Sequence, residues 1–375
     1  MGKGDTFPCE ATRLKDRASG RTVWQLTSVQ AVNHGPYFYN PPCTRDGRQI
    51  VFGSDRCGGD TEQLFLLEWP SGAIIQLTNG SSISAHNAVM APRGAAVYYF
   101  DGPGLKALSL QSFKERTLAQ IPEGLTLCSN PSISSDGQMV VYCAFKRPET
   151  KGRTGWDAYG AIYEARPHTE IWVAPIDGSG PRMVHSEENW LGHPQFRPGD
   201  KSAVVYSHEG PWDKLERIWA VRTDGSGQTR CMRPQEVGRE CIGHEYWTSD
   251  GNTLVYAYHT VDPESGERAG HSVRALDLVS GSERVIFEGH RVNHFTSNVD
   301  NSMIIADTND PTDPYLYMID VASGAAERLC ECRSTQRTYR STQDAHPHPC
   351  FSRDGRYVFF NSDQMGWPNF YMVVI

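Results

Sequence analysis

The sequence contains no stretch of about 18 consecutive apolar residues, so it offers no helix that could cross a membrane. Basic residues are outnumbered, 36 against 44 acidic ones, and the net charge of -8 argues against broad binding of nucleic acid, which requires a basic surface. Residues 1–17 lack the apolar core of a secretory signal. We therefore expect a cytoplasmic protein that binds neither membranes nor nucleic acid.

Cys-x-x-Cys pairs, the usual spacing of structural zinc sites, are absent although the chain has ten cysteines. The nearest pair, Cys330 and Cys332, supplies two metal ligands at most. We expect reduced thiols that are mostly buried. The 35 glycines and 23 prolines predict many turns, which argues against an all-helical bundle.

A turn followed by an apolar, strand-forming run recurs seven times along the chain. Asp-Gly supplies the turn in most copies, and Val, Ile, Tyr and Phe supply the strand after it, which predicts a hairpin. The second residues of the seven turns, about fifty positions apart, are Gly47, Gly94, Gly137, Asp200, Gly251, Asn301 and Gly355. A second apolar hairpin follows most copies, so each repeat provides four strands.

Seven repeats of this kind predict an all-β protein, a seven-bladed β-propeller with four-stranded blades. We expect residues 1–375 to form this propeller as a single domain, and two domains are the alternative. The last repeat stops at a third strand, residues 370–375, whereas residues 19–27 carry the pattern of a fourth strand. The N-terminal strand should therefore complete the last blade.

One position in each repeat carries a polar residue on the strand that we expect to line the central channel. Counting back seven residues from each turn marker gives Asn40, Asn87, Asn130, His193, His244, His294 and His348. Four consecutive histidines favour a functional site. A ring of polar side chains that binds water in the channel is the alternative.

The segment from Gln343 to Pro349 is the richest in chemistry, because it contains both His346 and His348. We expect these two histidines, two positions apart on a strand, to point to one face, stiffened by the prolines that follow them. Together with His294, they provide three imidazoles beside the amide oxygen of Gln343. Such a set can hold a first-row divalent ion, and Mn, Zn, Fe and Ni all suit it.

Other residues are candidates for proton transfer and for binding an anion. His244 is a candidate general base, and a neutral histidine bonded to Glu245 is the alternative. Arg217 offers a fork for a carboxylate, and an ordinary surface arginine is the alternative. The insertion at 145–170, which includes Lys146, is expected to form either an anion-attracting lid or a solvated loop.

The sequence resembles the oligogalacturonate lyases, a family of seven-bladed propeller polysaccharide lyases that acts in cytoplasmic pectin catabolism. The matching segments are 190–194, 207–211, 217–219, 244–247, the strand at His294, and 343–349, with further similarity in 20–27 and 36–39. The resemblance is weaker in blades two and three. His34-Gly-Pro and the 145–170 insertion depart from the family pattern, so the walls that select the sugar are expected to differ.

The resemblance implies a manganese ion held by His294, Gln343, His346 and His348. It also implies His244 as the catalytic base and Arg217 as the active-site arginine. We further expect contacts with the substrate from His193, His208, Arg217, Tyr39 and Lys146.

The activity implied is metal-dependent β-elimination, in which a lyase cleaves short uronides such as oligogalacturonate to a 4,5-unsaturated uronate. We expect an oligosaccharide substrate and a monomer or homodimer. Two alternatives remain open on the sequence. One is a metal-dependent hydrolase or epimerase that acts on another sugar acid, and the other is a non-catalytic propeller similar to TolB.

Overall fold

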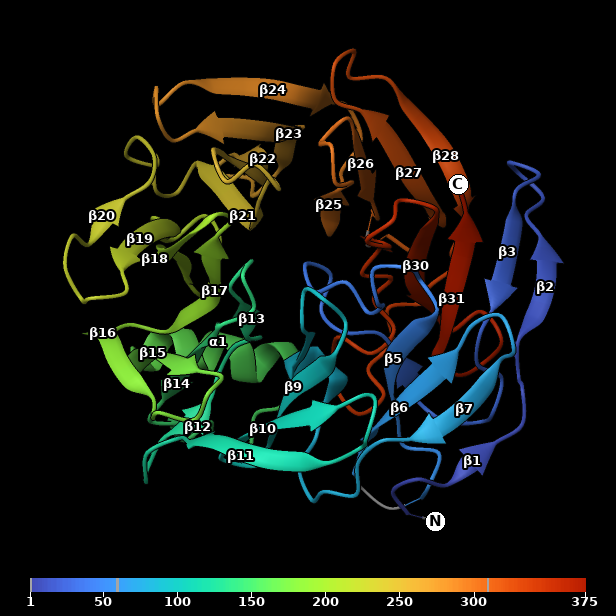
Figure 1. The fold of residues 1–375 in the computed structure, drawn as a ribbon. Helices are drawn as coiled ribbons and strands as arrows, with labels where there is room; N and C mark the ends of the chain where they lie inside the picture. The colour runs from blue at the N-terminus through green and yellow to red at the C-terminus, as the bar shows by residue number, and fades with distance from the viewer. Residues whose placement is uncertain (1, 59–60, 309) are drawn as a thin grey trace. The chain divides into compact units, whose positions relative to one another are not determined.

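The computed structural model describes residues 2–58, 61–308 and 310–375, which form seven sheets (Figure 1). The chain divides into two compact units. Unit 1 comprises residues 1–102, 106–116 and 292–375, and unit 2 comprises 103–105 and 117–291. The strand pairs are antiparallel in both units, as in β5–β6 and β22–β23. The prediction of a single domain stays a prediction.

Unit 1 contains three complete sheets. The first is formed by β1 (Thr6–Phe7), β4 (Asn33–His34), β5 (Gln49–Ser54), β6 (Gln63–Glu68) and β7 (Ala73–Gln76). The second is formed by β25 (Phe295–Ser297), β26 (Met303–Ala306), β27 (Tyr315–Asp320) and β28 (Ala326–Glu331). The third joins the two ends of the chain through β2 (Thr12–Lys15), β3 (Thr22–Gln25), β29 (Cys350–Phe351), β30 (Tyr357–Ser362) and β31 (Asn369–Val374).

Unit 2 also contains three complete sheets. The first is formed by β12 (Thr126–Leu127), β13 (Ser132–Ile133), β14 (Met139–Phe145), β15 (His168–Pro175) and β16 (Arg182–Glu188). The second is formed by β17 (Leu191–Arg197), β18 (Asp200–His208), β19 (Ile218–Arg222) and β20 (Thr229–Arg230). The third is formed by β21 (Glu240–Trp247), β22 (Thr253–Val261), β23 (Arg268–Asp277) and β24 (Glu283–Glu288).

The seventh sheet includes three of the four points at which the chain passes from one unit to the other, and the fourth lies between residues 291 and 292. It is formed by β8 (Ala88–Met90), β9 (Ala96–Asp101), β10 (Gly104–Ser109) and β11 (Glu115–Gln120), and the short 3-10 helix η1 (Ala85–Asn87) precedes it. Each of the seven sheets in the described part of the chain thus contains four or five strands, in agreement with seven four-stranded repeats.

The repeated turn has the backbone conformation that its sequence predicts. Positive φ angles occur at the turn markers Gly47 (68°) and Gly355 (71°), and Asn301 reaches the same region at 59°. In the fourth copy Gly199 takes the positive φ angle, so this turn is displaced by one residue from the predicted marker. The aspartate of the turn accepts a hydrogen bond from a nearby hydroxyl, as Asp46 does from Thr44 at 2.6 Å.

The N-terminal strand completes the last sheet, as predicted. Strand β3 pairs with β31 in antiparallel register, with Val23 opposite Val373 and Gln25 opposite Tyr371. Within unit 1, the first and last sheets pack through aromatic residues, since the ring of Phe370 stacks 6.4 Å from Phe52 and 5.6 Å from Phe359. Burial of these rings favours the packing of the first sheet against the last.

The core of unit 2 follows the same principle, with apolar residues packed between neighbouring sheets. Val141 and Cys143 of β14 contact a cluster that includes Val204 and Tyr206 of β18. The ten cysteines are all free thiols, and six of them are buried, which confirms the expectation of reduced and mostly buried cysteines.

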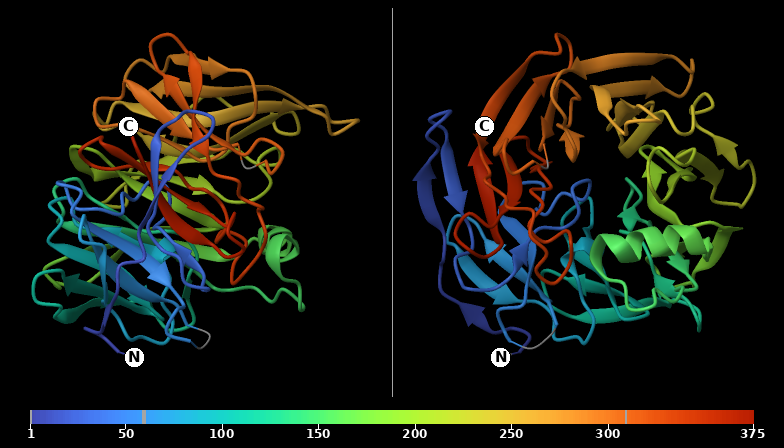
Figure 2. Two further views of the ribbon diagram at one scale, coloured as in Figure 1. Left: turned by 90° about the vertical axis from the view of Figure 1, so that its right-hand side faces the viewer. Right: turned by 180° about the vertical axis from the view of Figure 1, so that it is seen from behind.

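The insertion in the third repeat forms an α-helix, α1 (Gly155–Ala165), which lies beside the strands of unit 2 (Figure 2). The hydroxyl of Tyr159 lies 3.0 Å from the carbonyl oxygen of Gly210, to which it donates, and accepts from the amide of Gly210 at 3.1 Å. The alternative of a solvated loop is therefore wrong for 155–165. In the described residues, no helix has the length and apolar character needed to span a membrane.

Candidate functional site

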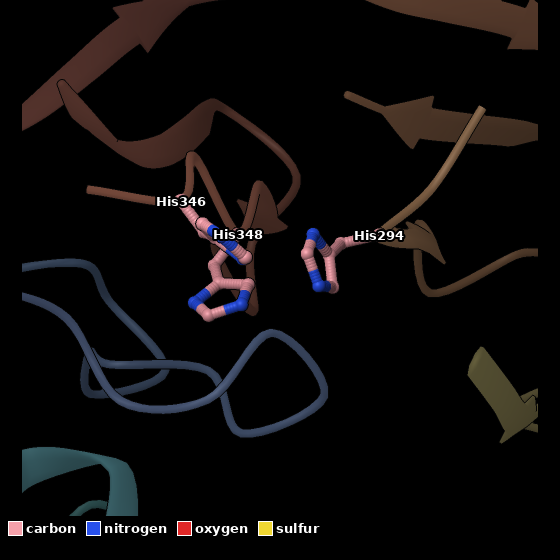
Figure 3. A group of neighbouring side chains, drawn as sticks. All are labelled: His294, His346 and His348. Carbon is pink, nitrogen blue, oxygen red and sulfur yellow. The ribbon is translucent and has the colours of Figure 1, made fainter. Parts of the chain in front are cut away.

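Three buried histidines converge in unit 1. His294, His346 and His348 each offer one ring nitrogen, and these nitrogens lie within 4.8 Å of one another. The ring centroid of His294 is 4.2 Å from that of His348 and 5.4 Å from that of His346. Figure 3 shows two imidazoles contributed by one segment and the third by another. The structure therefore brings together the three histidines predicted as metal ligands.

The prediction that His346 and His348 lie on a strand is wrong. Both lie in the irregular segment that precedes β29. Pro347 and Pro349 have no amide hydrogen to donate, so the segment cannot continue the ladder of β29, which begins only at Cys350. The segment is fixed instead by Asn361, whose amide nitrogen donates to Pro347 O at 2.8 Å and whose side chain donates to His346 O at 3.1 Å.

Asp307, which the sequence analysis did not predict, orients the histidine cluster through its hydrogen bonds. Its carboxylate accepts from Nδ1 of His294 at 3.0 Å, from the amide of His294 at 3.0 Å and from the amide of His348 at 3.2 Å. Because Nδ1 of His294 carries the proton, Nε2 is left as the ligand atom, an arrangement common at metal sites. A signal was available, since an aspartate directly follows the apolar strand β26.

Gln343, the fourth predicted ligand, lies three residues before His346 in the same segment. Its Oε1 atom is buried and accepts no hydrogen bond from the described residues. A buried amide oxygen without a donor is rare, and a metal ion would satisfy it. Burial, together with the neighbouring His294, lowers the pKa of His346 to about 3, so its imidazole is neutral, the form that binds metals. Nitrogen and oxygen donors without thiolate fit a first-row divalent ion.

Unit 2 contains a different cluster, in which Arg217 is enclosed by carboxylates. Its Nη2 atom lies 3.2 Å from Oε1 of Glu209, and its Nε atom lies 3.2 Å from Oε2 of Glu245. Arg217 is 2% exposed, so the alternative of a surface arginine is wrong. Burial raises the pKa of Glu209, but the charges of Arg217 and His193 outweigh this effect and lower it overall.

His193 borders this carboxylate cluster. Its Nε2 lies 3.5 Å from Glu209 Oε1, and its Nδ1 lies 3.7 Å from Glu245 Oε1. Glu245 also accepts a very short hydrogen bond from the hydroxyl of Ser207. The guanidinium fork predicted for a substrate carboxylate is thus directed at two carboxylates of the chain itself.

His193 and His244 occupy equivalent bulges in neighbouring sheets of unit 2. The pairing of β17 with β18 shifts register between Gly192 and Gln195, and that of β21 with β22 shifts between Gly243 and Tyr246. The φ angles of His193 and His244 are 48° and 52°, in the left-handed region that residues other than glycine rarely adopt. Bulges and positive φ angles of this kind are concentrated at functional sites.

His244 is half-buried and packs edge-on against Trp212, with ring centroids 4.7 Å apart. A glycine is required beside it, since a Cβ atom on Gly243 would lie 2.4 Å from the Trp212 ring. The guanidinium of Arg217 lies 5.6 Å from the same ring. Trp212 therefore fixes the position of His244 next to the carboxylate cluster of unit 2.

The remaining predicted residues lie in different surroundings. His208 stacks on Trp219 at 5.2 Å and lies 3.2 Å from Oε1 of Glu187. Lys146 is exposed just after β14. Tyr39, in unit 1, is half-buried against Tyr37, with ring centroids 5.0 Å apart.

Comparison with known proteins identifies the family. The profile of the family described as Oligogalacturonate lyase matches residues 1–375. The chain belongs to the oligogalacturonate lyase family. Two curated members of that family are similar over the whole chain: an oligogalacturonide lyase of Pectobacterium atrosepticum is 27% identical and an oligogalacturonate lyase of Dickeya dadantii 26%, each aligned over 100% of this chain and 98% of its own length.

Solved structures of the oligogalacturonate lyase family confirm the fold. A structure titled as an oligogalacturonate lyase in complex with manganese superposes with a TM-score of 0.92 at 27% identity, covering 100% of this chain and 98% of the other. The oligogalacturonate lyase of Vibrio parahaemolyticus gives 0.89 at 25% identity with the same coverage. The chain therefore has the seven-bladed β-propeller fold, and it is an enzyme of the lyase class.

Proposed function

We propose that this chain cleaves short oligogalacturonides by metal-dependent β-elimination in the cytoplasm. The observation that carries the proposal is the buried cluster of three histidines in a member of the oligogalacturonate lyase family. The unsatisfied Oε1 atom of Gln343, in the segment that carries two of these histidines, supports it. The manganese named for the solved relative matches this donor set. We assign the ion to His294, Gln343, His346 and His348.

β-Elimination removes the proton at C5 of the uronate, forms a C4–C5 double bond and releases the sugar oxygen at C4 with its bonding electrons. A divalent ion, when bound, supplies positive charge that neutralises the uronate carboxylate and stabilises the charge that develops during proton removal. Asp307 maintains His294 in the tautomer that leaves Nε2 available to the ion. We assign removal of the C5 proton to His244, which suits a neutral imidazole near pH 7.

Arg217, His193, His208, Tyr39 and Lys146 are proposed to contact the sugar. Arg217 is already paired with Glu209 and Glu245. To receive a substrate carboxylate as predicted, it has to exchange one of these partners for the substrate. His193 lies within 3.7 Å of the same two carboxylates, so it can pair with the carboxylate that Arg217 releases.

The proposal is tested by following the ultraviolet absorbance of the unsaturated product on a panel of short uronides with added Mn²⁺ and with a chelator. We expect a chelator-sensitive rise, greatest on galacturonate dimers and trimers. Absence of any rise, in protein shown to contain its metal, would contradict the lyase activity. Isomerised product without absorbance would favour an epimerase.

The assignment of His244 is tested with His244→Ala, using His271→Ala as a matched control. His271 is a half-buried histidine of the same unit that has no assigned role. We expect His244→Ala to lower kcat by about 10²–10⁴-fold with unchanged metal content, whereas the control retains its activity. Equal turnover in the two variants would remove His244 as the base.

A further inference from the structure

A second group of metal-ligating side chains lies in unit 1, outside the donor set assigned above. His34, His86 and Asp344 each offer one ligand atom, and these atoms lie within 4.8 Å of one another. Glu62 lies beside one of the three, since its Oε2 is 3.0 Å from Nε2 of His34. The four residues are between 0% and 8% exposed. Two imidazoles and two carboxylates are therefore enclosed together.

Neighbouring residues hold these four in place. Glu62 accepts from the amide of Ala85 at 2.6 Å, which fixes the position of its carboxylate. A Cβ atom on Gly53 would lie 1.8 Å from Oε1 of Glu62, so only glycine leaves room for this carboxylate. Asp344 is fixed by the hydroxyl of Ser341 at 2.7 Å. The surrounding residues thus position both carboxylates by hydrogen bonds and leave space for that of Glu62.

The hydrogen bonds of His34 show that the centre of the group requires a positive charge. Its Nδ1 lies 2.9 Å from the carbonyl oxygen of Gly35, which only accepts, so Nδ1 carries the proton. In a neutral imidazole Nε2 is then an acceptor, yet it lies 3.0 Å from Glu62 Oε2 and 3.9 Å from Asp344 Oδ1. Three acceptors facing one another in a buried place repel unless Nε2 carries a proton or a metal cation lies among them.

Two ligand atoms that are each about 2.1 Å from one ion are about 3.0–3.5 Å apart at adjacent positions and about 4.2 Å apart at opposite positions. The 3.0 Å between Nε2 of His34 and Oε2 of Glu62 suits adjacent positions. Oδ1 of Asp344, 3.9 Å from Nε2 of His34, has to shift by a few tenths of an ångström to bind the same ion. A proton on His34 would balance one of the two carboxylates, whereas a divalent ion balances both. A set of histidine and carboxylate ligands suits Mn²⁺, Fe²⁺ or Zn²⁺.

We propose that His34, His86 and Asp344, with Glu62 beside His34, bind a second divalent metal ion. The site adjoins the first one, since the ring centroids of His86 and His348 are 5.5 Å apart. Asp344 directly follows Gln343 in the chain, so an ion at the second site holds the loop that carries three ligands of the first. The role of the second ion is to fix that loop, and its binding does not depend on the proposed lyase activity.

The proposal is tested by counting metal ions in the full-length protein after removal with a chelator, reloading with Mn²⁺ and desalting. Elemental analysis is expected to find two equivalents per chain. His34→Gln and Asp344→Asn should each retain one, His294→Gln should also retain one, and the variant with both His34→Gln and His294→Gln should retain none. His185→Gln serves as the control, because this histidine also lies 3.0 Å from a glutamate oxygen, in unit 2, and should retain two.

One equivalent in the unmodified protein, lost in His294→Gln and kept in His34→Gln, would overturn the proposal and show that a proton on His34 balances the carboxylates. Two equivalents that persist in His34→Gln and Asp344→Asn would place the second ion elsewhere and overturn it as well. If these variants fail to fold, the unmodified apoprotein is titrated with Co²⁺. Two successive spectral transitions support the second site, and a single transition at one equivalent contradicts it.

Discussion

Replacing Asp307 by asparagine should weaken metal binding without removing a ligand. The carboxylate of Asp307 accepts three hydrogen bonds, two of them through Oδ2, from Nδ1 of His294 and from the amide of His348. Asparagine has one oxygen, and its amide group can only donate. If that oxygen takes the place of Oδ2, both of these bonds survive but lose the negative charge, and the amide of His294 faces a donor.

The size of the effect follows from these bonds. Loss of a carboxylate behind a ligating histidine costs about 10–100-fold in metal affinity, equivalent to about 1.4–2.7 kcal/mol. The unpaired amide of His294 in addition costs about 1–3 kcal/mol of folding stability. Asp307→Asn is therefore expected to lower both metal affinity and the unfolding temperature, with affinity as the decisive measurement.

The assay is a competition titration of apoprotein with Mn²⁺ against a chromogenic chelator, carried out in the His34→Gln background so that one site is measured. Asp313→Asn is the matched control, because Asp313 accepts from the hydroxyl of Tyr317 at 3.0 Å in the same unit. An affinity within threefold of the unmodified site, or an equal loss in Asp313→Asn, would refute the orienting role of Asp307.

Two further predictions concern stability in unit 2. The hydrogen bond from Arg233 lowers the pKa of Glu240 to about 2. Glu240→Gln should therefore lower the free energy of unfolding by about 1–2 kcal/mol at pH 7, and the difference from the unmodified protein should vanish as the pH falls from 4.5 towards 2. A difference in urea midpoints that does not change with pH would contradict this. Arg217→Met leaves Glu209 and Glu245 buried without their cation and should cost about 3–5 kcal/mol, part of which Glu245→Gln restores. Arg222→Met is the control, because Arg222 is an exposed arginine at the end of β19, the strand that directly follows Arg217. Equal urea midpoints for the two arginine variants would contradict the prediction.

The repeated turn is the reason that much of the architecture could be predicted. A turn at Gly47 or Gly355 needs a positive φ angle, and the glycine of the Asp-Gly pair predicts it from the sequence. The spacing of such turns then sets the register of the strands that follow them. That register predicts that His294 lies near His346 and His348. The N-terminal strand followed from the same pattern, because a strand lacking at one end of the chain was present at the other.

Partners that lie far away in the sequence could not be predicted in this way. Glu209 and Glu245 look like ordinary charged residues until the fold buries them around Arg217. Helix α1 likewise has weak local signals, since Thr154 makes no side-chain capping bond and Ile162 is its one buried residue. The helix depends on tertiary contacts such as that of Tyr159 with Gly210, which no local pattern encodes.

The histidines with φ angles in the left-handed region show which features the repeat pattern does not predict. Counting from the turns placed His193, His244 and His348 at equivalent positions, and the structure gives all three φ angles of 46–52°. The count assumes regular pairing, in which side chains alternate between the faces of a sheet, but bulges at His193 and His244 break that alternation. A strained backbone persists only where surrounding contacts impose it, as Trp212 does beside Gly243. The repeat therefore predicts which residues share a position, whereas the direction of each side chain is decided by packing.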